Sequence, residues 1–326
     1  MNKSLIALAV LAASGAAMAQ SSVTLYGRVD LSVGSLKELG KGSETKMFQG
    51  GDGGLTTSRW GLRGSEDLGG GLKAIYKLEN RFNATDGSSQ DPFFKGESTV
   101  GLSGGFGTVR LGRAATVYDD IRALSYSSNV FDSAFTPASN GVFKSGGDYN
   151  SRFNNMISYE TPSFGGFYAG LNHALDNDST KNETMTALKA GYKNGPLHAA
   201  LGYQNERKTD DKYVALSGAY DLGAASISAG YNQRNGTDAN GDDTEFTVGV
   251  NVPLGAVNLS AGYANSKTEK GGATSSKSSG FGLGATYSLS KRTRLYGGYR
   301  THEVKNGAGT KTADTRLFAL GIRHDF

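Results

Sequence analysis

Basic side chains recur at alternate positions over the first third of the chain, and this spacing decides what they could do. Residues two apart in a β-strand share a face of the sheet. The basic residues that share a face in this way are Arg28, Arg59, Arg63, Lys73, Lys77, Arg81 and Arg110, with Arg152 just before a later strand. Fixed charges in rows beside water select ions by their sign and break no bonds. The chemistry that these residues predict is therefore electrostatic.

Acidic residues accompany the basic row, and two interpretations of the arrangement remain open. The carboxylates concerned are Asp30, Glu79 and Glu97 in predicted strands, and Asp119 and Asp120 in a long connection. In one interpretation, some of the arginines pair with nearby carboxylates and hold a wall rigid. In the other, a basic wall faces the acidic connection, and the two create a field across the space between them.

Motifs for bond-making chemistry are weak. Gly280, Gly282 and Gly284 resemble a nucleotide-binding loop, but apolar residues alternate with them and no helix follows, so a strand is favoured. Segment 238–243 resembles a calcium loop without its later glutamate; a solvated loop is favoured there, and casual binding of a divalent ion stays open. The four histidines are scattered, and cysteine is absent. We therefore expect no catalytic residue, no metal centre and no cofactor.

The last twelve residues indicate how such rows of charge could be positioned. A mostly apolar set alternates there with a second set, as in a strand with two different faces; the apolar set is Phe318, Leu320, Ile322, His324 and Phe326. Such a strand keeps an unpaired edge unless it pairs with the first strand, and lipid tolerates no such edge. We therefore expect Phe326 to take part in barrel closure.

The same alternation recurs along the chain and predicts sixteen strands. They span 22–34, 58–66, 72–82, 97–103, 108–113, 154–160, 167–175, 184–192, 197–204, 213–220, 225–232, 244–252, 257–264, 279–287, 293–300 and 315–326. Short turns alternate with polar loops, such as 265–278 and 301–313, as in outer-membrane barrels. Tyrosines at two levels of the later strands favour two membrane interfaces over a soluble sandwich. The predicted fold class is all-β: a 16-stranded antiparallel transmembrane β-barrel.

Composition and charge exclude other classes. The 326 residues contain no stretch of roughly 18 apolar residues, the length that a helical membrane span needs. The formal charge of +4 is too small to indicate nucleic-acid binding. Lys3, an apolar core and Ala17-Met18-Ala19 together predict a cleaved signal peptide at 1–19, which leaves a barrel over 20–326.

One connection, 114–153, is much longer than the others. Connections of this length without strands are functional or disordered. Aromatic residues such as Phe135 and Phe143 oppose disorder. We expect this third loop to fold inward as a constriction loop that plugs part of the lumen.

Several motifs, spread from end to end of the mature chain, resemble those of one family. They include Leu25-Tyr26-Gly27-Arg28-Val29-Asp30, Ser58-Arg59-Trp60-Gly61-Leu62-Arg63-Gly64, Val109-Arg110-Leu111-Gly112-Arg113, Arg152-Phe153-Asn154-Asn155 and Gly321-Ile322-Arg323-His324-Asp325-Phe326. The chain thereby resembles the Gram-negative general porin family, in particular its betaproteobacterial branch. This resemblance implies a homotrimer in which the third loop narrows each pore and small hydrophilic solutes diffuse through.

The resemblance also bears on ion selectivity. In anion-selective relatives an arginine cluster lines the constriction, and Arg59 and Arg152 match positions of that cluster. Where those relatives carry a further basic run, this chain has Lys95-Gly96-Glu97. Because basic residues still outnumber acidic ones along the predicted wall, we expect a weak to moderate anion preference.

We therefore expect an outer-membrane porin for passive diffusion rather than an enzyme. Its predicted pore constriction comprises Arg28, Arg59, Arg63, Lys77, Glu97, Arg110, Asp119, Asp120 and Arg152. Expected partners are outer-membrane lipid, lipopolysaccharide, small solutes and ions, and two further copies of the chain, which would contact Leu25, Val29, Val100, Leu102, Val109 and Leu111. A surface adhesin or receptor, or a barrel enzyme with a serine and histidine paired on the lipid face, remains the alternative.

Overall fold

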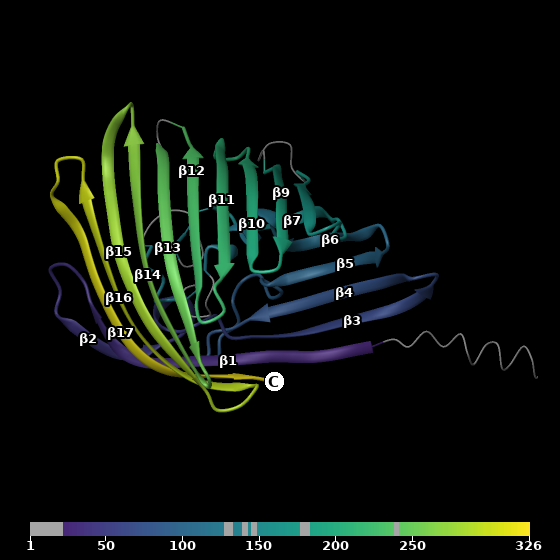
Figure 1. The fold of residues 1–326 in the computed structure, drawn as a ribbon, viewed down its shortest axis with the longest axis horizontal. Coiled ribbons are helices and arrows are strands. Elements are labelled where there is room, and N and C mark those ends of the chain that lie inside the picture. The colour runs from purple at the N-terminus through teal and green to yellow at the C-terminus, as the bar shows by residue number, and fades with distance from the viewer. Residues whose placement is uncertain (1–21, 127–132, 139–142, 145–148, 177–182, 238–240) are drawn as a thin grey trace, which may run out of the picture.

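The computed structural model describes residues 22–126, 133–138, 143–144, 149–176, 183–237 and 241–326. Within these residues, seventeen strand segments form one antiparallel sheet that closes on itself (Figure 1). The segments are β1 Ser22–Lys37, β2 Ser43–Phe48, β3 Arg59–Gly69, β4 Leu72–Arg81, β5 Glu97–Gly104, β6 Gly107–Ala115, β7 Arg152–Glu160, β8 Phe167–Ala174, β9 Met185–Asn194, β10 Leu197–Glu206, β11 Asp211–Asp221, β12 Ser226–Asn235, β13 Asp242–Leu254, β14 Val257–Lys270, β15 Ala273–Ser288, β16 Thr293–Asn306 and β17 Lys311–Asp325. Two short helices, α2 Gly50–Gly53 and α3 Val117–Leu124, complete the described elements, and neither is long and apolar enough to cross a membrane.

The barrel has sixteen strand positions because β2 and β3 share one of them. β2 pairs with the second half of β1, and β3 pairs with its first half. On its other edge β1 pairs with β17, so the first and last strands close the barrel, as Figure 1 shows in purple and yellow. The predicted sixteen-stranded antiparallel barrel is confirmed.

The two faces of the sheet differ as the alternation predicted. On β17, Leu320 and Ile322 are 57% and 49% exposed, whereas the adjacent Leu317 and Ala319 are fully buried. Outward apolar side chains with this exposure suit contact with lipid, and charged residues such as Arg323 lie on the inner face of the same strand. Gly280, Gly282 and Gly284 lie within β15, in agreement with the strand interpretation.

The predicted loops at 265–278 and 301–313 are wrong over most of their length. β14 and β15 continue through the first segment and turn only around Gly271 and Gly272, and β16 and β17 likewise extend through most of the second. These strand ends carry polar residues on both faces, such as Ser276 and Lys277, so the apolar face that marks a strand is missing. The backbone hydrogen bonds of a hairpin do not require that face.

Residues 49–58 interrupt the second strand position and leave the sheet toward the lumen. We call this segment the 49–58 insert; it contains α2, and its Leu55 is buried against Phe135 of the third loop. Glycine permits this path, because a Cβ on Gly53 would lie 2.4 Å from the ring of Phe48, and Gly50 adopts a φ of +53°. No sequence pattern had predicted the insert.

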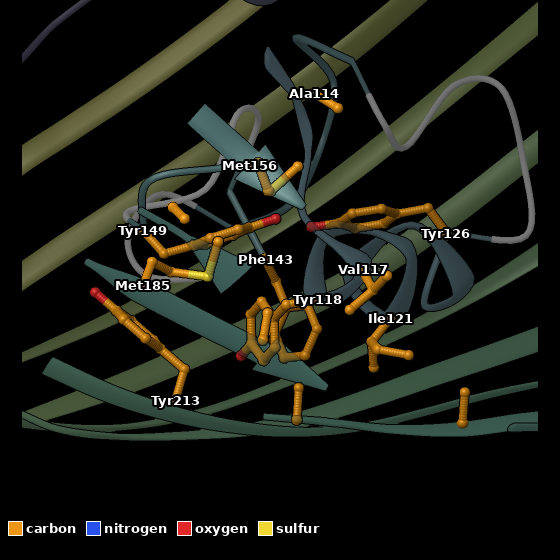
Figure 2. Packing of buried hydrophobic residues seen from close by; sticks show 14 of the residues in the cluster. Ala114, Val117, Tyr118, Ile121, Tyr126, Phe143, Tyr149, Met156, Met185 and Tyr213 are labelled. Carbon is orange, nitrogen blue, oxygen red and sulfur yellow. The ribbon is translucent and has the colours of Figure 1, made fainter. Parts of the chain in front are cut away.

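The described part of the third loop packs against the inner wall. α3 lies over β8 to β12, and Figure 2 shows Val117, Tyr118 and Ile121 directed from the helix into the packed cluster. Glycines of the wall make room for these side chains. A Cβ on Gly202 would lie 2.6 Å from Ile121, and one on Gly298 would lie 2.4 Å from Phe135.

Candidate functional site

The predicted basic residues of the early strands lie on the inner face. Arg28 shares its strand face with Asp30, which is fully buried. In the sheet register Arg28 stands opposite Arg59, and Arg59 stands opposite Arg81. One row of arginines therefore crosses β1, β3 and β4 at a single level.

A second row lies farther along the same strands. Arg63 stands opposite Lys77, and its guanidinium lies 5.1 Å from the ring centre of Tyr26. Arg110, on β6, extends this row along the wall and contacts Glu97 of β5. Arg63, Lys77 and Arg110 therefore lie close together on neighbouring strands.

Several of these charges belong to one alternating series of contacts, which we call the ion-pair chain. Its links are Arg59–Glu79, Glu79–Lys77, Lys77–Glu97, Glu97–Arg110, Arg110–Glu160, Glu160–Lys189 and Lys189–Asp120. Arg110–Glu160 is a close contact, and the nitrogen–oxygen distances of the other links range from 2.5 to 3.9 Å. Four cations alternate with four anions, so the ion-pair chain carries no net charge at neutral pH. Pairing that holds the wall is therefore part of the arrangement.

Lys189 connects this chain to the third loop. Its ammonium lies 2.8 Å from Glu160 on the wall and 2.5 Å from Asp120 of α3, and its side chain is only 6% exposed. Asp120 is thus held against β9 and does not face the arginines as the sequence had suggested. Lys189 and Glu160 were missed as site residues, although strand parity on β9 would have placed Lys189 on the inner face beside the buried Ala187.

Asp119 is the acidic residue of the loop that interacts electrostatically with arginines of the wall. Arg122 donates to its Oδ1 at 3.2 Å, and the hydroxyl of Tyr149 donates to the same oxygen. Burial raises the pKa of Asp119, but the charge of Arg122 and the hydrogen bond from Tyr149 outweigh burial and hold that pKa below its ordinary value. The carboxylate therefore stays ionised, and it interacts electrostatically with Arg81 and Arg152 of the wall.

Arg59, Arg81 and Arg152 form the arginine cluster of the wall. Arg81 interacts electrostatically with both of the others. Arg59 donates from Nη2 to Thr56 Oγ1 at 2.7 Å and from Nε to the Thr57 carbonyl at 3.1 Å. Arg152 donates to the Gly96 carbonyl at 3.0 Å and to Ser151 Oγ at 3.2 Å, and both of these acceptors are neutral groups.

Two carboxylates each contact more than one cation. Glu79 lies within 3.9 Å of Arg59, Lys77 and Arg81 and accepts a hydrogen bond from Tyr26 at 3.0 Å. At the closing edge, Arg28 and Arg323 both contact Asp325 at 3.0 Å. The sequence interpretation did not include Arg323 as a site residue, although its position in the alternation of the last strand places it on the inner face. Basic groups therefore outnumber acidic groups on this side of the lumen.

Phe326 lies at the seam between the first and last strands. Its backbone N–H donates to the carbonyl of Gly27 at 3.0 Å, and the N–H of Gly27 donates back at 3.0 Å. The phenyl ring covers Gly27, where a Cβ would lie 2.3 Å from the ring. This reciprocal pair extends the strand pairing of the seam to the final residue.

The remaining candidates of the sequence have simpler surroundings. Residues 238–240 of the predicted acidic loop lie outside the described part of the chain. Within the described residues, no group of three or more His, Cys, Asp or Glu side chains could hold a metal ion. His324 shares a hydrogen bond of 2.8 Å with Thr293 at the barrel rim.

Comparisons with known proteins agree with this architecture. The family model described as Gram-negative porin matches residues 5–307. Outer membrane porin protein 32 of Delftia acidovorans is 40% identical, over 99% of this chain and 95% of that protein, and an outer membrane porin protein of Bordetella pertussis is 31% identical over the whole of both. Among solved structures, the anion-selective porin from Comamonas acidovorans superposes with a TM-score of 0.77 at 32% identity, covering 94% of this chain and all of that one. This chain, a closed barrel with charged side chains on its inner wall, belongs to the Gram-negative porin family of the outer membrane.

Proposed function

We propose that this outer-membrane channel passes ions and small hydrophilic solutes with a weak to moderate preference for anions. The observation that carries the proposal is the cluster of Arg59, Arg81 and Arg152, of which Arg81 and Arg152 interact electrostatically with Asp119. The ion-pair chain is balanced, whereas Arg81 shares Glu79 with two other cations and Arg152 donates to the neutral oxygens of Gly96 and Ser151. An excess of positive charge at a narrow point favours passage of anions.

The third loop supports the same proposal as a constriction element. Its α3 is tied to the wall through Lys189, and its Asp119 interacts with the arginine cluster, so the loop and wall together shape the path. The related Comamonas porin, at 32% identity, is itself described as anion-selective. Of the predicted constriction residues, Arg59, Arg152 and Asp119 form its centre, whereas Arg63 and Arg110 lie in the second row and Arg28 lies near the closing edge.

We further propose a homotrimer embedded in lipid and lipopolysaccharide after removal of residues 1–19. The outward faces of β1, β5 and β6 carry aliphatic side chains, and Leu25 and Val100 are 60% and 58% exposed. These three outward faces lack the tyrosines that line the outer face of the later strands, such as Tyr231 and Tyr263. Contact between protein surfaces needs no interfacial aromatic ring, and a cyclic assembly repeats one patch around its axis.

The test is the reversal potential of the purified protein in a planar bilayer across a KCl gradient. A channel with anion preference is expected, and Arg59→Ala and Arg152→Ala should both reduce it. Cation preference in the parent, or unchanged selectivity in both variants, would contradict the proposal. Absence of conductance would instead favour an adhesin or receptor built on the same barrel.

A further inference from the structure

We infer that the 49–58 insert is a second element of the constriction. Asp30 is a positioning residue: it holds this insert against Arg59 and thereby sets the anion preference. The inference rests on the proposed function, because it assigns an origin to the selectivity of the same site. It concerns the break between β2 and β3, which neither the strand pattern nor the third loop explains.

Asp30 holds the insert against the wall through hydrogen bonds. It is fully buried, and its Oδ1 accepts hydrogen bonds from the Leu55 N–H at 3.3 Å and from the Tyr296 hydroxyl at 2.5 Å. Ser58, where the insert rejoins the sheet, accepts at Oγ from the Asp30 N–H at 3.0 Å. A buried carboxylate that gathers donors from the insert and from β16 fixes the insert to the wall.

Gly54 lets the backbone of the insert approach the carboxylate of Asp30. A Cβ on Gly54 would lie 2.7 Å from Asp30 Oδ1 and 2.9 Å from the backbone nitrogen of Gly50. Ser32, one inward position further along β1, donates to the Gly53 carbonyl at 2.7 Å. The insert is therefore held at several adjacent points and has a defined position.

The insert in turn orients the guanidinium of Arg59. Two of its donors are directed to the insert, at Thr56 Oγ1 and the Thr57 carbonyl, while Glu79 lies 3.6 Å from Nη1. A guanidinium presents its donors in a fixed fork, so two fixed acceptors determine where its charge lies. Displacement of the insert would release the charge of Arg59 toward Glu79.

The insert also meets the third loop. The Ala134 N–H donates to the Gly54 carbonyl at 3.1 Å, and Leu55 packs in one buried cluster with Phe135. Arg300 of β16 donates to the Ala134 carbonyl at 2.6 Å. The loop therefore has a second support on this side of the barrel, and the insert links that support to Arg59.

Reversal potentials of charge-matched variants test the inference. Asp30→Asn and Asp30→Ala remove the same charge, but only Asn keeps an oxygen that can accept from Leu55 and Tyr296. Loss of a negative charge alone would raise anion preference equally in both, so a difference between them reports positioning. We expect Asp30→Ala to be less anion-preferring than Asp30→Asn, and the difference to disappear in the Arg59→Ala background.

Thr56→Val provides a test that alters no charge. It removes one acceptor of Arg59, and a displacement of the guanidinium by about 3 Å would lower the anion-to-cation permeability ratio about twofold. Thr247→Val is the matched control, since this buried hydroxyl on β13 donates to the Tyr263 carbonyl at 3.4 Å, away from Arg59. Heat-modifiable mobility of each variant reports folding. If Asp30→Ala does not assemble, the comparison of Thr56→Val with Thr247→Val still tests the inference.

Two outcomes would overturn the inference. If Arg59→Ala shifts selectivity while Thr56→Val matches the parent and Asp30→Ala matches Asp30→Asn, the positioning role is wrong and the proposed function stands. If Arg59→Ala itself leaves selectivity unchanged, the role assigned to the arginine fails and the inference fails with it.

Discussion

Replacement of Arg152 by alanine should lower the anion preference by an amount that depends steeply on salt. Arg152 lies at the start of β7, where neutral groups hold its guanidinium in place, so its removal leaves no hydrogen-bonded carboxylate to rearrange. An ion that passes about 5 Å from a unit charge in water interacts with it by about 0.8 kcal/mol. At roughly 0.1 M salt, where the Debye length is about 10 Å, screening reduces this energy to about 0.5 kcal/mol.

These energies give the expected change in permeability. Without the charge an anion loses this stabilisation and a cation is relieved of the same repulsion, so the anion-to-cation permeability ratio should fall about fivefold at about 0.1 M salt. At about 1 M the Debye length is about 3 Å, and the ratio should change by less than about twofold.

The assay is the reversal potential across KCl gradients of equal ratio, centred on low and on high salt. Lys291→Ala is the control, because it removes the same charge from an exposed turn between β15 and β16. A shift of equal size at both salt concentrations, or one no larger than that of Lys291→Ala, would refute the position assigned to Arg152.

Three further outcomes follow from the geometry. Deletion of Phe326 removes the reciprocal hydrogen bonds of the seam and should lower assembly into the outer membrane; normal yield and normal heat-modifiable mobility would contradict this role. Lys189→Met leaves two carboxylates without their shared cation and should lower the free energy of unfolding by about 1 kcal/mol, with more current noise, whereas Lys193→Met at the exposed end of β9 should do neither. Because the pKa of Asp119 lies below its ordinary value of 3.8, the stability that it contributes with Arg122 is complete above that value and is lost as pH falls through the lowered pKa; a loss of thermal stability already near pH 6 that is absent from Asp119→Asn would oppose this.

The strands could be predicted because lipid and water impose opposite demands on alternate residues. Leu320 and Ile322 reveal the outer face and Arg28 the inner one without any knowledge of tertiary contacts. The same logic fails at the ends of β14 to β17, where both faces meet water and the alternation disappears. It fails also at β2, whose exposed residues Ser43 to Met47 show no apolar face.

The basic residues of the site could be predicted from the sequence, but the residues that they contact could not. Parity places Arg59 and Arg110 on the inner face, but the partner of each depends on strand register and on the path of the loop. Asp120 illustrates this, since its contact with Lys189 joins residues 69 positions apart. The 49–58 insert could not be predicted for another reason. Its shape depends on close backbone approach at Gly53 and Gly54, and a sequence pattern does not distinguish such glycines from those of an ordinary turn.

The glycines of the inner wall bear on how such channels could be re-engineered. Gly202, Gly230 and Gly298 leave space for Ile121, Phe143 and Phe135, respectively. A side chain at any of these three positions would occupy the space that the loop residue fills. A third loop grafted from another barrel would therefore need its own pattern of vacant positions on the recipient wall. Loop and wall form one transferable module, and exchange of the loop sequence alone should produce a misfit even where the two barrels superpose strand for strand.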